Sequence, residues 1–207
     1  MVLYKRRQLF SGLSIKVGMV FSRVGISPNS WTILVIVPTL FSLYYLLGRQ
    51  FLVAAAFLII SAFIDFIDGS VARVMGKVTK LGAYLDTIMD RYVEAIILVG
   101  LLFVGLPDFY LSSTVWIFLF LLGSMMTTYT KAAAKEKELS DKEITGGLLE
   151  RGERLIILFV GILLAYFRLS YLTYIIVALA VLTNITALQR IKIAVNSARN
   201  IARLKAK

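Results

Sequence analysis

Long apolar stretches separated by short polar connections make up most of the chain. Six of these stretches have close to the ~20 residues that a helix needs to cross the hydrocarbon core of a bilayer. They cover residues 30–47, 51–74, 81–104, 114–137, 152–168 and 171–194. The pattern predicts an all-α integral membrane fold with six transmembrane helices, the first of them kinked at Pro38.

Residues 1–26 show a narrower apolar pattern ahead of these stretches. Their apolar positions recur at spacings of three and four residues, at Phe10, Leu13, Val17, Val20 and Val24. On a helix over residues 3–24 they form one stripe, with Lys5, Lys16 and Arg23 roughly a quarter turn away. We therefore expect an amphipathic helix in the membrane interface, with its basic side chains reaching lipid phosphates. Packing of this helix on the cytoplasmic end of the bundle is a compatible alternative.

The placement of Lys and Arg predicts the orientation of the six crossings. All but two of the 23 lysines and arginines lie near the two termini or near the second and fourth connections, which share one side of the membrane. Only Arg49 and Arg168 remain for the other side. Lys and Arg concentrate on the cytoplasmic side of membrane proteins. We therefore expect a protein of the cell membrane whose two termini lie in the cytoplasm, together with the basic tail of residues 195–207.

The composition favours one polytopic membrane domain over residues 1–207. The chain is 59% hydrophobic and contains no Cys, and its mean hydropathy is +0.83. A net charge of +11 is also typical of nucleic-acid-binding proteins, but here the cations gather at one membrane boundary. The expected partners of this charge are membrane lipids, with no nucleic acid.

Four aspartates lie at the ends of two of the most apolar stretches. Asp65 and Asp68 are three residues apart, and Asp86 and Asp90 are four residues apart. At these spacings, each pair shares one face of its helix. Because one stretch ends and the next begins at the same membrane boundary, the four acids can converge on one point.

Four carboxylates beside hydrocarbon repel one another unless a cation lies among them. Oxygen ligands suit Mg2+, Mn2+ or Ca2+, and a chain without His or Cys lacks the ligands typical of zinc and copper. Two ions held side by side are an arrangement used in phosphoryl transfer. Gly69 and Ala72 leave room for a ligand on the same face, and the guanidinium of Arg73 can bind a phosphate. The alternatives are structural ion pairs with Arg73 and Arg91, or the cation site of a transporter.

These residues resemble the signature of the CDP-alcohol phosphotransferases, integral membrane enzymes of phospholipid synthesis. All eight fixed positions match, at Asp65, Asp68, Gly69, Ala72, Arg73, Gly82, Asp86 and Asp90. The resemblance implies that Asp65, Asp68 and Asp86 bind Mg2+ or Mn2+, and that Asp90 completes the shell of a second ion. It also implies a homodimer.

The resemblance further implies a site for the CDP-alcohol donor. The start of the first transmembrane helix contacts the nucleotide in family members, which corresponds here to Pro28, Asn29, Ser30 and Trp31. The same pocket is implied to include Asp65, Gly69, Arg73 and Thr79. From the local sequence alone, Asn29 or Ser30 is equally well explained as a helix N-cap.

The reaction expected from the resemblance is attack by an acceptor hydroxyl on the phosphorus that bears the lipid, with CMP leaving. A hydroxyl is a poor nucleophile near neutral pH, so a base must take its proton. The last aspartate of the motif has this role in the family, which implies Asp90 as the catalytic base. The donor is expected to be CDP-diacylglycerol or CDP-archaeol.

Two pairs of cationic residues indicate the acceptor. Lys131 and Lys135 end the fourth predicted helix, and Arg151 and Arg154 begin the fifth. If the pairs face each other, they form a pocket for a phosphate, so a phosphorylated polyol fits better than serine or choline. Positive-inside bias alone also places cations here.

Two local stretches resemble the family branch that uses inositol 1-phosphate. They are residues 129–136 and 150–154. That branch more often has arginine at the position of Lys131, so this chain keeps the charge and loses the bidentate geometry. The expected acceptor is 1-myo-inositol phosphate, with glycerol 3-phosphate as the alternative.

Overall fold

The computed structural model describes residues 7–139 and 146–205. This part of the chain is helical and contains no β-strand beyond an isolated bridge between Phe109 and Leu111. The predicted all-α fold is therefore confirmed. The helices form two compact units, and each is described by itself. Lys5 of the predicted N-terminal helix lies outside the described residues, as does the side chain of Phe10.

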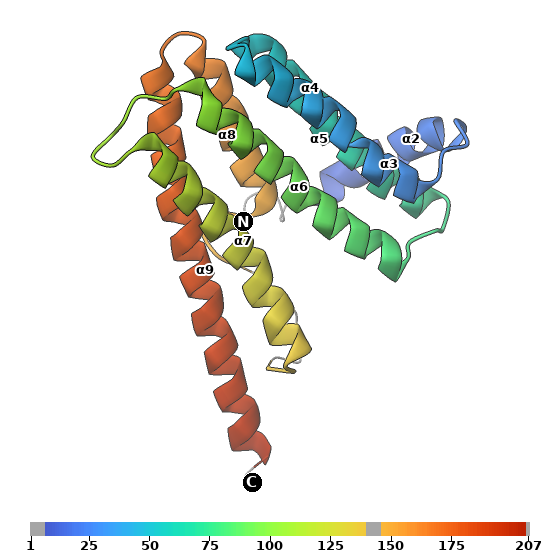
Figure 1. Cartoon of the computed structure of the whole chain (residues 1–207). Coiled ribbons are helices and arrows are strands. Elements are labelled where there is room, and N and C mark those ends of the chain that lie inside the picture. The colour runs from blue at the N-terminus through green and yellow to red at the C-terminus, as the bar shows by residue number, and fades with distance from the viewer. Residues whose placement is uncertain (1–6, 140–145, 206–207) are drawn as a thin grey trace. The chain divides into compact units, whose positions relative to one another are not determined.

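The first unit contains helices whose bounds follow the apolar pattern closely (Figure 1). They are α2 (Arg7–Ser22), α3 (Pro28–Leu34), α4 (Ile36–Leu47), α5 (Phe51–Val74) and α6 (Lys80–Val104). The first long apolar stretch is divided at Val35 into α3 and α4. Pro38 lacks the N–H that would bond to the carbonyl of Leu34, which weakens the helix at this point.

Buried hydroxyl groups join α4 to α5. Thr39 Oγ1 and Ser61 Oγ lie 2.8 Å apart, and Ser42 Oγ donates to the carbonyl oxygen of Ala54 at 2.8 Å. All three hydroxyl-bearing residues are at most 1% exposed. Such bonds and close packing at small residues are what hold helices together in a lipid environment.

The helix α2 packs against α5 through small residues. Ser14 and Gly18 are buried at this contact, and a Cβ added at Gly18 would lie 2.5 Å from the carbonyl oxygen of Ser70. Members of the predicted apolar stripe remain more than half exposed, namely Leu13, Val20 and Val24. The helix α2 therefore packs on α5, as in the alternative raised from the sequence. Its exposed apolar side chains are compatible with a position in the membrane interface as well.

The second unit contains α7 (Ser113–Glu136), α8 (Arg151–Ala165) and α9 (Leu169–Lys205). The helices α7 and α9 pack along each other (Figure 1). Asn184 donates from Nδ2 to the carbonyl oxygen of Leu119 at 2.8 Å. A Cβ added at Gly123 would lie 2.5 Å from Thr183 Oγ1, so glycine allows the two helices to approach closely here.

The last helix is longer than the sixth apolar stretch. It continues from the apolar part through the predicted basic tail and ends at Lys205. No Gly or Pro occurs between Leu169 and Lys205, so nothing in the local sequence ends the helix where its side chains become polar.

Membrane character is evident in four helical segments of the described residues. Those long and apolar enough to cross a bilayer are Pro28–Leu47, Phe51–Val74, Ser113–Glu136 and Leu169–Asn200. Large apolar side chains on the outside of the units, such as Phe103 at 70% and Phe118 at 61% exposed, suit contact with lipid. The chain is therefore a membrane protein.

Candidate functional site

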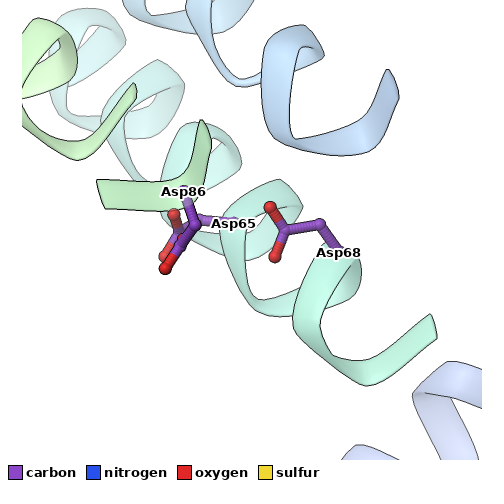
Figure 2. Close-up of side chains that lie close together, drawn as sticks. All are labelled: Asp65, Asp68 and Asp86. Atoms are coloured by element: carbon purple, nitrogen blue, oxygen red, sulfur yellow. The ribbon is translucent and has the colours of Figure 1, made fainter. Parts of the chain in front are cut away.

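Three predicted metal ligands meet between α5 and α6. Asp65 and Asp68 project from α5, and Asp86 projects from α6 (Figure 2). Each offers one carboxylate oxygen, and these three oxygens all lie within 4.8 Å of one another. Both helices belong to the first unit. The structure thus brings together acids that are 21 residues apart in the chain.

The burial of Asp68 makes this cluster suitable for a divalent cation. Asp68 is only 6% exposed, and among the described residues its Oδ2 has no hydrogen-bond partner. A carboxylate oxygen that is removed from water without a partner destabilises the fold. Closely spaced carboxylates that bring oxygen ligands alone fit Mg2+ or Mn2+.

Asp90 lies one helical turn beyond Asp86 on α6 and is half-buried. Its carboxylate is not part of the three-acid cluster described above. The neighbouring Arg91 donates from Nη1 to Oε2 of Glu94 at 2.9 Å. Asp90 therefore occupies a position beside the cluster, on the same helix as one of its members.

A stripe on α5 runs from the acidic cluster to Arg73. Asp65, Gly69 and Arg73 are four residues apart along the helix, so they lie in one row. A Cβ added at Gly69 would be 3.3 Å from Arg73 Nη1. The guanidinium therefore folds back over Gly69 toward the turn that carries Asp65. This row combines an anion-binding guanidinium with a carboxylate. Between them is Gly69, whose lack of a side chain leaves space for a ligand.

The start of α3 identifies the N-cap of the first membrane segment. Ser27 is the cap, because its hydroxyl accepts from the backbone N–H of Ser30 at 3.1 Å. The alternative explanation of Asn29 or Ser30 as the N-cap of this helix is therefore wrong. Pro28 occupies the first helical position, which proline favours, and this places the cap one residue before it.

The start of α6 lies close to the start of α3. Thr79 is the N-cap of α6, and its Oγ1 accepts from the N–H of Gly82 at 3.0 Å. A Cβ added at Gly82 would lie 3.2 Å from Asn29 Oδ1. Asn29 and Thr79, both predicted to contact the donor, therefore lie on either side of Gly82.

Trp31 is fixed in an apolar cluster rather than at the surface. It is 7% exposed and packs with Ile67 and Val71 of α5. Among the described residues, its Nε1–H has no hydrogen-bond partner. A buried indole N–H normally has an acceptor, so the start of α3 carries a second polar group that remains to be satisfied.

The predicted acceptor residues belong to the second unit. Lys131 is half-buried and Lys135 is exposed on α7, whereas Arg151 is half-buried and Arg154 is buried on α8. Arg154 is 2% exposed, and its Nη1 donates to Thr127 Oγ1 at 3.1 Å. Thr127 precedes Lys131 by four residues, so Arg154 contacts the face of α7 that also carries Lys131.

Arg190 of α9, which was not among the predicted site residues, contacts the same residue of α7 as Arg154 does. Its Nη1 donates to the carbonyl oxygen of Thr127 at 2.6 Å, and its Nε donates to the carbonyl oxygen of Gly146 at 3.0 Å. Arg154 of α8 and Arg190 of α9 thus both donate hydrogen bonds to Thr127. No local pattern signals this contact, because Arg190 and Thr127 are 63 residues apart.

Two serines that contact Arg73 were also missed. Ser14 and Ser70 lie within hydrogen-bond distance of its Nη2. A signal was present in the sequence, since Ser14 and Gly18 form a pair of small residues four apart, a spacing typical of close helix contacts.

Comparison with known proteins gives matches over most of the chain. The profile of the family described as CDP-alcohol phosphatidyltransferase matches residues 26–186. An archaetidylinositol phosphate synthase of Pyrococcus horikoshii is 34% identical over 176 residues, which are 85% of this chain and 87% of that protein. A phosphatidylinositol phosphate synthase of Mycobacteroides abscessus is 32% identical, over 75% of this chain and 70% of its own length.

Solved structures agree with these sequence matches. The phosphatidylinositol phosphate synthase of Mycobacterium tuberculosis with CDP-DAG bound superposes with a TM-score of 0.77 at 26% identity, covering 89% of this chain and 94% of that one. The same enzyme in complex with manganese and citrate gives a TM-score of 0.77 at 28% identity, with 87% and 88% of the two chains covered.

Proposed function

Because the chain belongs to the CDP-alcohol phosphatidyltransferase family, we propose that it transfers a phosphatidyl-type group from a CDP-lipid to a hydroxyl of 1-myo-inositol phosphate, with release of CMP. The family membership confirms the prediction from the eight-residue motif and the class of enzyme. It decides against the cation transporter. Inositol phosphate as acceptor is supported by the names of the archaeal and bacterial relatives.

The observation that carries this proposal is the carboxylate cluster and its neighbour Arg73. The cluster offers three carboxylate oxygens within 4.8 Å of one another, and a buried oxygen of Asp68 has no partner among the described residues. The guanidinium of Arg73 folds over Gly69 beside them. Together these groups are suited to a metal-bound pyrophosphate. A CDP-alcohol carries such a pyrophosphate between its nucleotide and its lipid. The apolar exterior of α5 and α6 suits the lipid part.

Asp65, Asp68 and Asp86 are the proposed metal ligands, and Asp90 completes the shell of a second ion. The choice of Mg2+ or Mn2+ follows from the oxygen ligands and is supported by the relative that contains manganese. When bound, such ions neutralise the phosphates and stabilise the charge that develops on the leaving oxygen.

The proposed donor pocket begins at the acidic row and extends to the starts of α3 and α6. Asp65, Gly69 and Arg73 bind the pyrophosphate region. The nucleotide contacts are assigned to Pro28, Asn29, Ser30, Trp31 and Thr79. The contact between Asn29 and Gly82 supports this assignment, because it joins the starts of the two helices.

Asp90 is proposed as the catalytic base. It takes the proton of the acceptor hydroxyl while that oxygen forms a bond to the phosphorus bearing the lipid, and the bond from this phosphorus to CMP breaks. The electron pair of the broken bond leaves with CMP. A general base of this kind typically contributes a rate factor of about 100 to 10,000.

The acceptor phosphate is assigned to Lys131, Lys135, Arg151 and Arg154. Two charge-bearing helices of one unit supply these residues. The half-buried position of Arg190 and its bonds to Thr127 and Gly146 add a third helix to the same cationic cluster. Clustered guanidinium groups favour a phosphorylated polyol over a neutral or cationic alcohol.

The proposed topology has six transmembrane helices, preceded by α2 lying in the membrane interface. Lys and Arg placement supports a cell-membrane protein with its acidic site and both termini facing the cytoplasm. The exposed apolar residues of α2 support its contact with lipid.

We propose that residues 1–207 act as one catalytic domain, since the family match runs through both units. The homodimer implied by the family resemblance is also proposed, to be tested by light scattering of the purified protein.

Purified protein incubated with CDP-diacylglycerol or CDP-archaeol and labelled acceptor tests the function. The expected result is metal-dependent release of CMP and formation of a labelled lipid with 1-myo-inositol phosphate. A labelled lipid formed from glycerol 3-phosphate alone would overturn the choice of acceptor. Release of CMP at the same rate in excess chelator would overturn the metal-dependent mechanism.

A further inference from the structure

The N-terminal helix α2 makes a polar contact with the side chain of Arg73. Arg73 Nη2 donates to Ser14 Oγ at 2.8 Å and lies 3.4 Å from Ser70 Oγ. The two serine hydroxyls are themselves 2.9 Å apart. Ser14 is 7% exposed and Ser70 is fully buried, so both hydroxyl groups are shielded from water, whereas the side chain of Arg73 is exposed.

The direction of this hydrogen-bond chain follows from counting protons. The hydroxyl of Ser70 donates to the carbonyl oxygen of Phe66 at 2.8 Å. A serine hydroxyl has one proton to donate, so Ser14 must be the donor in its bond with Ser70. The lone pairs of Ser14 Oγ then face Arg73, whose N–H groups can only donate. The chain therefore runs from Arg73 through Ser14 and Ser70 to the backbone of α5.

The position of Ser14 is fixed by packing on both sides of it. Gly18 lies one turn further along α2, where a Cβ would come within 2.5 Å of the backbone of Ser70. Phe21, another turn further, makes an edge contact with Trp31 at a ring-centroid distance of 5.7 Å. The helix thus has a close backbone approach and an aromatic contact that hold Ser14 against Arg73.

The two terminal nitrogens of the Arg73 guanidinium have different surroundings. Its Nη2 is engaged by α2, while its Nη1 lies over Gly69, in the row that leads to Asp65. An arginine side chain loses considerable rotamer freedom when it binds a ligand. A protein contact that already fixes the guanidinium lowers this loss on binding.

We propose that Ser14 is a positioning residue for the CDP-lipid donor, acting by holding Arg73 in the orientation that binds the pyrophosphate. This inference rests on the donor role of Arg73 under the proposed function. It gives α2 a part in the donor site, in addition to any contact with the membrane surface.

The test is equilibrium binding of CDP-diacylglycerol to the purified, detergent-solubilised protein with Mg2+ present, together with steady-state kinetics. Ser14→Ala is expected to weaken donor binding about tenfold and to leave the KM for 1-myo-inositol phosphate unchanged. Ser22→Ala is the matched control, because Ser22 is on the same helix and, within the part of the chain that the structure describes, its hydroxyl donates to the carbonyl oxygen of Met19 in α2 itself. This control should bind donor like the unaltered protein.

A double-mutant cycle separates positioning from a purely structural role. With Arg73→Ala in place, adding Ser14→Ala should cause no further loss of donor binding, since the group that Ser14 positions is gone. Equal losses in both backgrounds, or a rise in the acceptor KM as well, would overturn the inference. Unchanged binding in Ser14→Ala alone, with weakened binding in Arg73→Ala, would overturn it and leave the donor site standing. Unchanged binding in Arg73→Ala would remove the donor role of Arg73 and this inference with it.

Discussion

The acidic cluster of the first unit and the cationic cluster of the second unit differ in how their charges are satisfied. Asp68 is buried, and one of its carboxylate oxygens has no hydrogen-bond partner among the described residues. One oxygen of each of Asp65, Asp68 and Asp86 lies within 4.8 Å of the others. Arg154 is also buried and Arg190 is half-buried, but both donate to oxygens of their own unit. The acidic cluster is incomplete without a cation, whereas Arg154 and Arg190 already contribute hydrogen bonds to the fold.

This difference separates the evidence for function from the evidence for stability. A buried carboxylate oxygen without a partner, close to two further carboxylates, reduces stability, so it indicates a ligand. Guanidinium groups that bind main-chain and hydroxyl oxygens stabilise the fold whether or not a phosphate arrives. Substitutions should therefore affect activity alone in the acidic cluster, and both activity and stability in the cationic one.

The largest effect is expected for Asp68→Ala. Removal of this ligand should abolish metal-dependent donor binding and reduce CMP release by at least about 1000-fold. In excess chelator, the variant should melt no lower than the unaltered protein, because an unsatisfied buried oxygen is lost. Donor titrations with and without Mg2+ and a thermal melt measure the two effects. A lower melting temperature would contradict the view that the cluster is incomplete without its cation.

Asp90→Asn should separate chemistry from binding within the same helix. The amide cannot take a proton, so turnover should fall about 100- to 10,000-fold, while CDP-lipid still binds with an affinity close to that of the unaltered protein. Single-turnover CMP release and donor titration measure these quantities. Loss of donor binding together with turnover would assign Asp90 to the metal site alone.

Arg154→Lys should affect both function and stability. The charge remains, but the hydrogen bond from Nη1 to Thr127 Oγ1 is lost, so we expect the acceptor KM to rise about tenfold and the melting temperature to fall. The donor KM should not change. Arg168→Lys, in the connection between α8 and α9, is the control and should leave both measurements unchanged. An unchanged acceptor KM in Arg154→Lys would leave only stability and positive-inside bias to explain this arginine.

The smallest effect is expected for Gly69→Ala. The new methyl group would lie 3.3 Å from Arg73 Nη1, so the guanidinium must move slightly, and donor binding should weaken about threefold. Helix propensity favours alanine by up to about 1 kcal/mol, so the melting temperature should stay level or rise. Gly12→Ala in α2, where a Cβ meets nothing within 4 Å, is the control for propensity alone. A fall in melting temperature would show that Gly69 serves packing instead.

The hydrophobic pattern predicted most of the helices because an apolar stretch of spanning length has few alternatives in lipid. The bounds of α5, Phe51–Val74, agree with the predicted segment at both ends. Helical spacing likewise predicted that Asp65 and Asp68 share a face and can meet Asp86. These features depend on local periodicity and on the order of the helices, which are both present in the sequence.

Features that depend on contacts between distant residues were not predictable in the same way. The burial of Arg154 and the bonds of Arg190 depend on how α7, α8 and α9 pack. Ser14 acquires its role only through contact with α5. The continuation of α9 to Lys205 was missed because the prediction followed hydrophobicity, which ends before the helix does.

The hydroxyl bonds between α4 and α5 bear on how the protein can be handled. Thr39, Ser42 and Ser61 join the two helices through hydrogen bonds, and neither hydrocarbon tails nor detergent chains can compete for these. The register of this pair is therefore independent of whether the surrounding tails are ester- or ether-linked. The α4–α5 pair, which carries Asp65 and Asp68, should accordingly keep its packing in ester-linked and in ether-linked lipids. The preference for CDP-diacylglycerol or CDP-archaeol can therefore be measured in membranes of either type.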